Sequence, residues 1–122
     1  MARILLVDDE LLITSAFCLT LEDMDHYVIT ASDGQEGLER ALKEQPDIVI
    51  TDYMMPKLDG LEMIRRLRAN GFEAPIILTT SVPISDPTVG YDIYLRKPYF
   101  EPDLVAVIDQ AQKLIAQKKK ML

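Results

Sequence analysis

The chain has 122 residues, of which 48% are hydrophobic and one is a cysteine, and its net charge is −7. That length suits one domain with a substantial core, and no apolar stretch is long enough to span a bilayer. The negative charge argues against direct binding of nucleic acid, because phosphate recognition needs clustered cations.

The first third of the chain predicts a strand, a helix and a second strand. Short apolar runs over Arg3–Val7 and Tyr27–Ala31 are too brief and too β-branched for helices, so we expect strands there. Between them, Leu11–Asp23 has a helical pattern. The residues expected to face inward on this helix are Leu12, Ala16, Leu19 and, as a further candidate, Phe17. His26 lacks any partner pattern and is expected in a loop.

The middle of the chain continues the alternation. Asp33 and Glu36 form a capping box, which predicts a second helix that runs to about Glu44. A third strand is expected over Asp47–Thr51, where another short apolar run occurs. After a loop, a third helix is expected over Leu61–Ala69.

The last part of the chain predicts two more strands and one more helix. The strands are expected over Ile76–Thr80 and Asp92–Leu95. Pro83 and Pro87 lie between them and oppose a regular helix in that segment. A last helix is expected from about Pro102, because proline is tolerated in a first helical turn. Its apolar face is formed by Leu104, Ile108, Ala111 and Ile115.

This order of elements predicts an α/β fold. Five short apolar strands separated by helices indicate a parallel sheet that is covered on both faces. In a flavodoxin-like, doubly wound sheet of order 2-1-3-4-5, the first and third strands are neighbours at the switch point. Ligands of such sheets bind there, beyond the carboxyl ends of the strands.

Acidic residues follow the two strands that are expected to be neighbours. Asp8 and Asp9 come directly after the first strand, and Asp52 follows the third. Carboxylates brought this close repel one another unless a cation, a lysine or a proton compensates them. Thr80 and Lys97 follow the fourth and fifth strands, so they reach the same edge. The set indicates divalent-metal and phosphoryl chemistry.

Five motifs carry a resemblance to a known family. They are Ile4–Glu10, Ile50–Pro56, Leu58–Gly60, Pro75–Ser81 and Tyr94–Pro98. Taken in this order, they resemble the response-regulator receiver domain, the CheY-like family of two-component signalling. The resemblance spans nearly the whole chain and implies that residues 1–122 form a single receiver domain.

The resemblance implies a phosphoacceptor and a metal site. Asp52 would accept a phosphoryl group from a phosphohistidine of a partner kinase. Asp9, Asp52 and the backbone carbonyl of Met54 would bind Mg²⁺ directly, and Asp8 would act through metal-bound water. Oxygen ligands of this kind suit Mg²⁺.

The resemblance also implies a switch. Lys97 would pair with a phosphoryl oxygen, and Thr80 would hydrogen-bond to the phosphoryl group and move on activation. Tyr94 would turn inward together with Thr80. The bond between Lys97 and Pro98 is typically cis in the family.

The implied function is a phosphorylation-dependent signalling switch that catalyses only its own phosphorylation and dephosphorylation. Its partners would be a sensor histidine kinase or phosphotransfer protein and an output partner or attached domain, with a homodimer as a further option. We expect no contact with nucleic acid or membrane. A cytoplasmic location is expected, because Asp8 comes too early for a secretory signal and Cys18 has no partner for an internal disulfide.

Three other functions are alternatives to the phosphorylation-dependent switch. The first is a degenerate receiver that acts as a phosphorylation-independent interaction module, which the intact acidic set and Lys97 disfavour. The second is a phosphatase of the haloacid-dehalogenase type, which expects an acid where this chain has Met54. The third is flavin binding, which is disfavoured because acids follow the first strand in place of hydroxyls and glycines.

The sequence departs from the family in one segment. Lys97 comes only 17 positions after Thr80, whereas typical receivers have several more residues there and a full fourth helix. We therefore expect the helix between the fourth and fifth strands to be short, irregular or missing, and the output surface near the fifth strand and last helix to be altered.

Overall fold

The computed structural model describes residues 1–84, 86 and 88–120. The strands are β1 (Arg3–Val7), β2 (Tyr27–Ala31), β3 (Ile48–Asp52), β4 (Ile76–Thr80) and β5 (Ile93–Arg96). The helices are α1 (Leu11–Asp23), α2 (Gly34–Glu44), α3 (Gly60–Ala69) and α4 (Glu101–Lys120). Each predicted strand lies within one residue of its observed position. None of the described helices is both long and apolar enough to cross a membrane.

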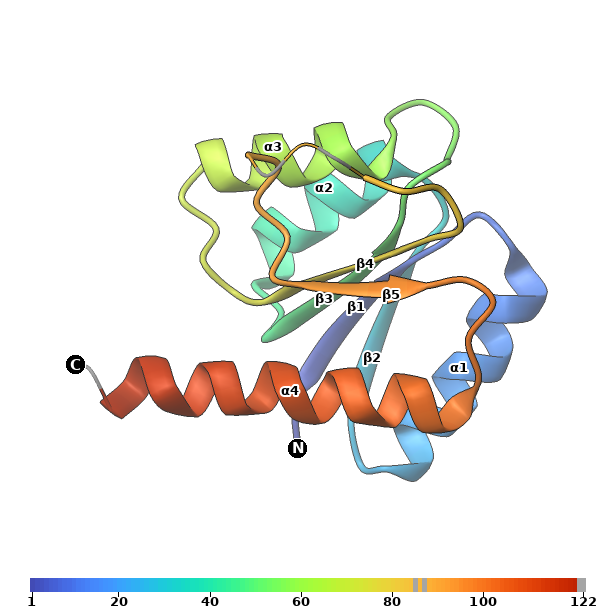
Figure 1. The fold of residues 1–122 in the computed structure, drawn as a ribbon, viewed down its shortest axis with the longest axis vertical. Coiled ribbons are helices and arrows are strands. Elements are labelled where there is room, and N and C mark those ends of the chain that lie inside the picture. The colour runs from blue at the N-terminus through green and yellow to red at the C-terminus, as the bar shows by residue number, and fades with distance from the viewer. Residues whose placement is uncertain (85, 87, 121–122) are drawn as a thin grey trace.

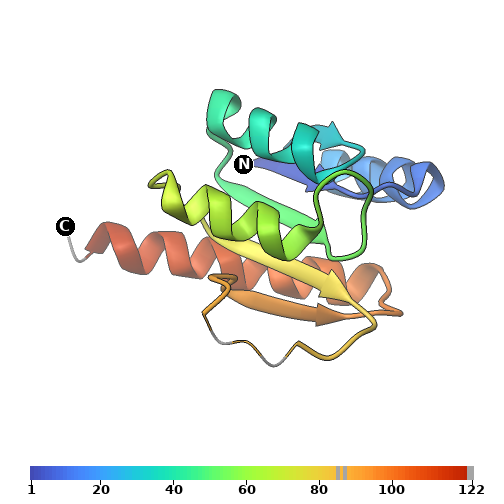
Figure 2. The same ribbon diagram turned by 90° about the horizontal axis from the view of Figure 1, so that it is seen from above.

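The five strands form one parallel sheet in the order β2-β1-β3-β4-β5, as the sequence predicts. Helices α2 and α3 cover one face of the sheet, and α1 and α4 cover the other (Figures 1 and 2). Because both faces are covered, β3 and β4 are buried along their whole length, and polar residues occur only at their carboxyl ends. The predicted flavodoxin-like fold is therefore confirmed.

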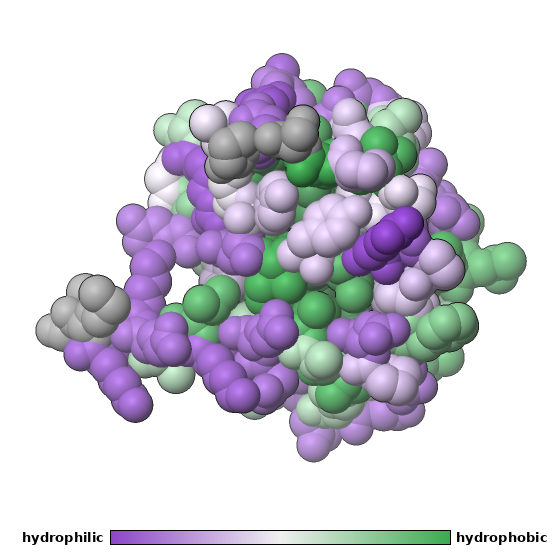
Figure 3. All heavy atoms as spheres, viewed as in Figure 1, coloured by the Kyte–Doolittle hydropathy of each residue, from purple (hydrophilic) through white to green (hydrophobic). Residues whose placement is uncertain are grey.

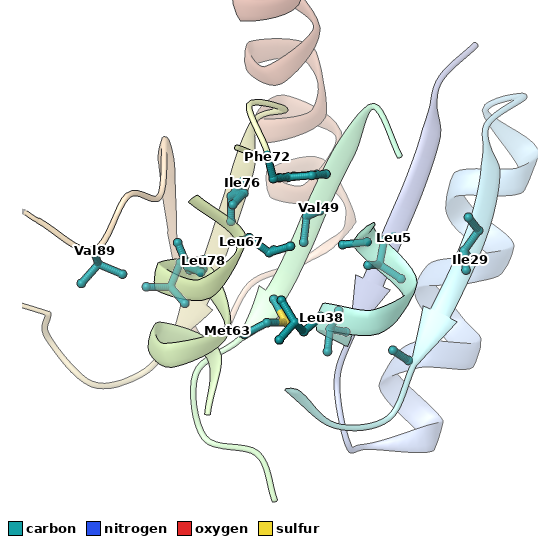
Figure 4. Packing of buried hydrophobic residues seen from close by; sticks show 14 residues of the cluster. Leu5, Ile29, Leu38, Val49, Met63, Leu67, Phe72, Ile76, Leu78 and Val89 are labelled. Carbon is teal, nitrogen blue, oxygen red and sulfur yellow. The ribbon is translucent and has the colours of Figure 1, made fainter. Parts of the chain in front are cut away.

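Alternate strand residues build two separate cores. Leu5 and Val49 point toward α2 and α3, where they pack with Leu38 and Leu67 (Figure 4). The opposite core contains Ile4, Leu6, Ile48, Ile50, Ile77, Leu104, Ile108 and Ala111. The buried face predicted for the last helix is thus confirmed, with Ile115 partly buried at its end.

The predicted inward face of α1 is wrong for three residues. Leu12 is 88% exposed, Leu19 is 66% exposed, and Ala16 is also exposed. Apolar side chains occur on more than one side of this helix, so their spacing fits two alternative faces.

Contacts with the sheet and with Tyr99, just before α4, select the other face of α1. Thr14 and Leu21 are buried there, and the further candidate Phe17 is partly buried. The Phe17 ring stacks on Tyr99 with 5.1 Å between centroids. Since Tyr99 is far away in the sequence, periodicity within α1 could not identify this face.

The segment between β4 and β5 has no helix among its described residues, as the sequence predicts. Its described parts run back along β5 as an irregular loop (Figure 2). Pro83 lies in this loop, whereas Pro87 lies outside the described residues. The next helix in the chain is α4, which has 20 residues and is the predicted last helix.

Arg68 of α3 anchors the far end of this loop. Its guanidinium donates to the carbonyls of Gly90 (3.0 Å) and Phe72 (2.7 Å) and to the carboxylate of Asp92 (2.8 Å). Gly90 has φ +104°, and a Cβ there would lie 2.9 Å from the Arg68 side chain. Only glycine suits both the backbone conformation and this close approach.

His26 lies in the turn between α1 and β2, as predicted, but it has a partner that the sequence did not indicate. The ring is buried, and Nδ1 accepts a hydrogen bond from the Ala2 amide at 3.0 Å. Burial, followed by the charge of the amino terminus, lowers the pKa of His26. Protonation of Nδ1 would also remove the acceptor for Ala2.

Acid should therefore destabilise the fold through His26. Because its folded pKa is lowered, the unfolded chain binds this proton first, and the stability present above about pH 6.5 is lost as the pH falls through and below that value. His26→Gln, which removes the chain's only histidine, should flatten the free energy of unfolding between about pH 7 and pH 5.5. Urea denaturation at stepped pH measures this, and an equally steep decline in the variant would contradict it.

Candidate functional site

Three of the predicted site residues, Asp8, Asp52 and Lys97, lie at the carboxyl edge of the sheet. Asp8 follows β1 directly and Asp52 ends β3, and the two strands pair with Val7 opposite Thr51. The two carboxylates therefore meet at the switch point of the sheet. Lys97 follows β5 and reaches the same edge.

Lys97 lies between the two buried carboxylates. Its Nζ is 3.1 Å from Asp52 Oδ2 and 3.8 Å from Asp8 Oδ2. Asp8 is 3% exposed and Asp52 is 7% exposed. Backbone amides hold the other oxygens: Glu10 donates to Asp8 Oδ1 at 2.9 Å, and Tyr53 donates to Asp52 Oδ1 at 2.8 Å. Each carboxylate is thus oriented with one oxygen toward the lysine.

The carboxylates suit a divalent cation. Oxygens of Asp8, Glu10 and Asp52 lie within 4.8 Å of one another. Burial raises the pKa of Asp8, and the hydrogen bond from Glu10 and the charge of Lys97 only partly oppose this. One lysine therefore leaves negative charge uncompensated, and hard carboxylate oxygens are the ligands that Mg²⁺ prefers.

The structure and the sequence differ on which neighbouring acid joins this group. Glu10, which sequence reasoning did not assign to the site, contributes an oxygen. Asp9 is exposed and lies outside the three-carboxylate group. The only signal for Glu10 was its place as the third acid after β1. The metal-binding role of Asp9 stays a prediction.

Thr80 and Tyr94 are linked to the site through one backbone atom. The Thr80 carbonyl accepts the Lys97 amide at 3.1 Å and the Tyr94 hydroxyl at 3.2 Å. The Thr80 hydroxyl is buried and accepts the Val82 amide at 3.0 Å. Displacement of Thr80 would therefore disturb both the lysine that faces Asp52 and the tyrosine on the neighbouring strand.

The loop after Asp52 closes tightly against the strand end. The Gly60 amide donates to the Tyr53 carbonyl at 2.7 Å, and a Cβ at Gly60 would lie 2.1 Å from the Asp52 carbonyl oxygen. Asp59 caps α3 by accepting the Glu62 amide. Met54 lies exposed in this loop. The role predicted for its carbonyl remains a prediction.

Tyr99 borders the site, although sequence reasoning did not select it. Burial raises the pKa of its phenol, and the charges of Asp8 and Asp52 raise it further.

A mainly apolar cavity of about 300 Å³ beside Tyr99 also contacts Lys97 and Glu10. A larger cavity of about 490 Å³, lined by Pro46, Ala74 and Leu114 among others, contains none of the site residues. The Lys97–Pro98 peptide bond is cis.

Known proteins share this sequence pattern. A profile described as "Response regulator receiver domain" matches residues 4–109. The alkaline phosphatase synthesis transcriptional regulatory protein PhoP of Bacillus subtilis is 39% identical over 102 residues, which cover 80% of this chain and 42% of PhoP. Response regulator MprA of Mycobacterium leprae is 39% identical over 87% of this chain and 49% of MprA. The chain thus spans less than half the length of these relatives.

Solved structures share the fold. The chemotaxis protein CheY4 of Vibrio cholerae has a TM-score of 0.81 and 31% identity, covering 91% of this chain and 98% of that protein. A response regulator receiver domain protein from Clostridium thermocellum has a TM-score of 0.85 and 33% identity, covering 100% of both chains.

Removing the charge of Asp8 should stabilise the metal-free protein. Asp8→Asn keeps the acceptor for the Glu10 amide but removes a buried charge that Lys97 only partly compensates. We expect the melting temperature in EDTA to rise by a few degrees, in line with about 1 kcal/mol for a domain of this size. The control Asp9→Asn alters an exposed side chain and should change the melting temperature little. A lower or unchanged melting temperature for Asp8→Asn would contradict this account of the site.

Proposed function

The chain belongs to the response regulator receiver domain family of two-component signalling, and on this premise we propose that Asp52 accepts a phosphoryl group from a histidine kinase or phosphotransfer protein. The observation that carries the proposal is the buried Asp52 carboxylate, held by one backbone amide and placed 3.1 Å from Lys97. Phosphoryl transfer chiefly needs such positioning and charge compensation.

In the proposed reaction, an Asp52 oxygen forms the new bond to phosphorus while the bond to the donor imidazole breaks. Lys97 then pairs with a phosphoryl oxygen in place of the free carboxylate. Thr80 turns its hydroxyl from the Val82 amide toward the phosphoryl group, and Tyr94 follows it inward. The shared Thr80 carbonyl supports this coupling, since both Lys97 and Tyr94 donate to it.

Mg²⁺ is the proposed cofactor. Asp9, Asp52 and the Met54 carbonyl would hold it directly and Asp8 through water, while the position of Glu10 supports an additional contact. When bound, the ion supplies positive charge that compensates the phosphoryl oxygens. Lys97 and the backbone amide of Tyr53 keep Asp52 oriented for attack.

Exposed apolar side chains support docking of the phosphodonor protein next to Asp52. Leu11 and Leu12 begin α1, Met54 lies in the loop after β3, and Phe100 precedes α4. All four therefore surround the carboxyl edge of the sheet. Isolated exposed apolar residues are common, but several at one site are typical of an interaction surface.

The wider role follows from the same proposal. The domain would catalyse only its own phosphorylation and dephosphorylation and would regulate an output partner or attached domain, as a monomer or homodimer. The unpaired Cys18 supports a cytoplasmic location. The alternative, a phosphorylation-independent interaction module, has less support, because it gives no role to the paired Asp52 and Lys97.

Acetyl phosphate with Mg²⁺ should add one phosphoryl group to the wild-type protein. Asp52→Asn should abolish the adduct, which should be labile to base and hydroxylamine as acyl phosphates are. Asp59→Asn, which preserves a helix cap outside the site, is the matched control and should be modified normally. Intact-mass spectrometry measures the adduct. A full adduct on Asp52→Asn would contradict the assignment of Asp52 as the phosphoacceptor. Lys97→Ala should retain some phosphorylation but lose the conformational response.

Mg²⁺ should stabilise the folded protein by relieving repulsion among the carboxylates. At about 100 times the dissociation constant, linkage adds roughly 2.7 kcal/mol to the free energy of unfolding. Asp52→Asn should lose most of this gain, whereas Asp59→Asn should keep it. Melting curves with and without Mg²⁺ measure the effect. An unchanged wild-type midpoint would show that the proposed metal site is wrong.

A further inference from the structure

The amino-terminal edge of the sheet carries a cavity that takes no part in the proposed function. It has a volume of about 490 Å³ and lies between the C-terminal half of α4 and the loops that lead into β3, β4 and β5. In Figure 1, α4 extends past the amino ends of these strands, and in Figure 3 the surface is hollowed above this part of the helix, at the lower left. Because Asp52 and Lys97 lie at the opposite edge of the sheet, the cavity is separate from the phosphoryl site.

The walls of this cavity are mainly apolar. They include Pro46 and Pro75, which precede β3 and β4, the neighbouring Ala74, and Leu114 and Ile115 of α4. The two prolines are buried, whereas Leu114 stays exposed at the mouth of the cavity. A cavity of this size and lining suits a small molecule that carries one large apolar group.

Most of the charges around the cavity are already compensated. Lys118 Nζ lies 3.6 Å from Glu73 Oε2 and donates to the Glu73 carbonyl at 3.2 Å. Asp92 Oδ2 accepts from the Arg68 guanidinium and from the Ile76 amide, each at 2.8 Å. These contacts hold the end of α4 against the loop before β4 and fix the residue before β5. They leave little of this charge for a ligand.

Two opposite charges at one end of the cavity have no such partner. Asp47 and Lys119 line this cavity and also an adjoining one of about 290 Å³, so both lie where the two cavities meet. Among the residues that the structure describes, neither side chain has an oppositely charged group within ion-pair distance. Asp47 Oδ2 accepts the Arg3 amide at 2.8 Å, which orients the carboxylate. An acid and a base are thus both available to a ligand next to the apolar walls.

We propose that this cavity, which we call the amino-edge cavity, binds a free amino acid with a large apolar side chain. The ammonium group of the ligand faces Asp47, and its carboxylate faces Lys119. Its side chain packs on Pro46, Pro75 and Leu114. A ligand with a single charge fits less well, because Asp47 repels an anion and Lys119 repels a cation. Both charged groups lie at the exposed rim, so they select among ligands, whereas the apolar contact supplies most of the affinity.

Ligands that differ in one charge test this assignment on the wild-type protein. L-Phenylalanine should shift the amide resonances of Ala74 and Leu114 with a dissociation constant on the order of 1 mM, as expected of a small ligand in an open site. Hydrocinnamate lacks the ammonium group and phenethylamine lacks the carboxylate, so each should bind at least about threefold more weakly. Glycine has both charges but no apolar group and should bind more weakly still. Titration followed by NMR measures all four.

Two substitutions connect each charge of the ligand to one side chain. Asp47→Asn keeps an acceptor for the Arg3 amide and should bring phenylalanine and hydrocinnamate to nearly equal affinity. Lys119→Gln should do the same for phenylalanine and phenethylamine. Lys113→Gln is the matched control, because this exposed lysine of α4 pairs with Asp109 and does not line the cavity. It should preserve the wild-type order of affinities.

Several results would overturn the proposal. Equal affinities of phenylalanine and its two singly charged analogues for the wild-type protein would exclude recognition of a zwitterion. Unchanged Ala74 and Leu114 resonances with leucine, phenylalanine and tryptophan would exclude an amino acid in the amino-edge cavity. Asp52→Asn should bind phenylalanine as the wild-type protein does, so a failure of the proposed phosphorylation would leave this test intact.

Discussion

Two buried carboxylates that share one lysine constrain the rest of this structure. Asp8 and Asp52 are both buried, and Lys97 together with two backbone amides compensates their carboxylates in part. The compensation is incomplete, as the raised pKa of Asp8 indicates. The site can therefore accommodate additional positive charge. Apolar residues at these two positions would stabilise the fold more than the buried charges do, so the acids point to a function.

The sheet order makes this arrangement possible. Strands β1 and β3 are neighbours although a strand and two helices separate them in the chain. Their carboxyl ends meet where the loops leave in opposite directions, so none of the described helices covers the acids. Close packing then sets the positions: Gly60 brings the loop after Asp52 against the strand end, and the space at that point excludes even a methyl group.

The connection from the site to the surface is short. One carbonyl oxygen, that of Thr80, accepts both the amide of Lys97 and the hydroxyl of Tyr94. Beyond it, the loop before β5 is held at its far end by Arg68 and has no helix among its described residues. Arg68 anchors the far end of the loop, whereas the hydroxyls of Thr80 and Tyr94 hold the end near the site, which favours movement of the part closest to Thr80.

The sequence by itself determined the strands, their approximate bounds and the meeting of Asp8, Asp52, Thr80 and Lys97. These features follow from local patterns: buried parallel strands are short apolar runs, and polar residues that follow them must reach one edge. The lack of a helix among the described residues before β5 was also predictable, because proline opposes helix formation locally.

Only the tertiary structure decided which side of each element is buried and which side chains converge. α1 has apolar residues on two sides, and contacts with Tyr99 and the sheet chose the one opposite to that predicted from Leu12 and Leu19. The presence of Glu10, and not Asp9, in the three-carboxylate group depends on where the turn after β1 points its side chains. These outcomes depend on contacts between residues far apart in the chain, and local periodicity carries no information about such contacts.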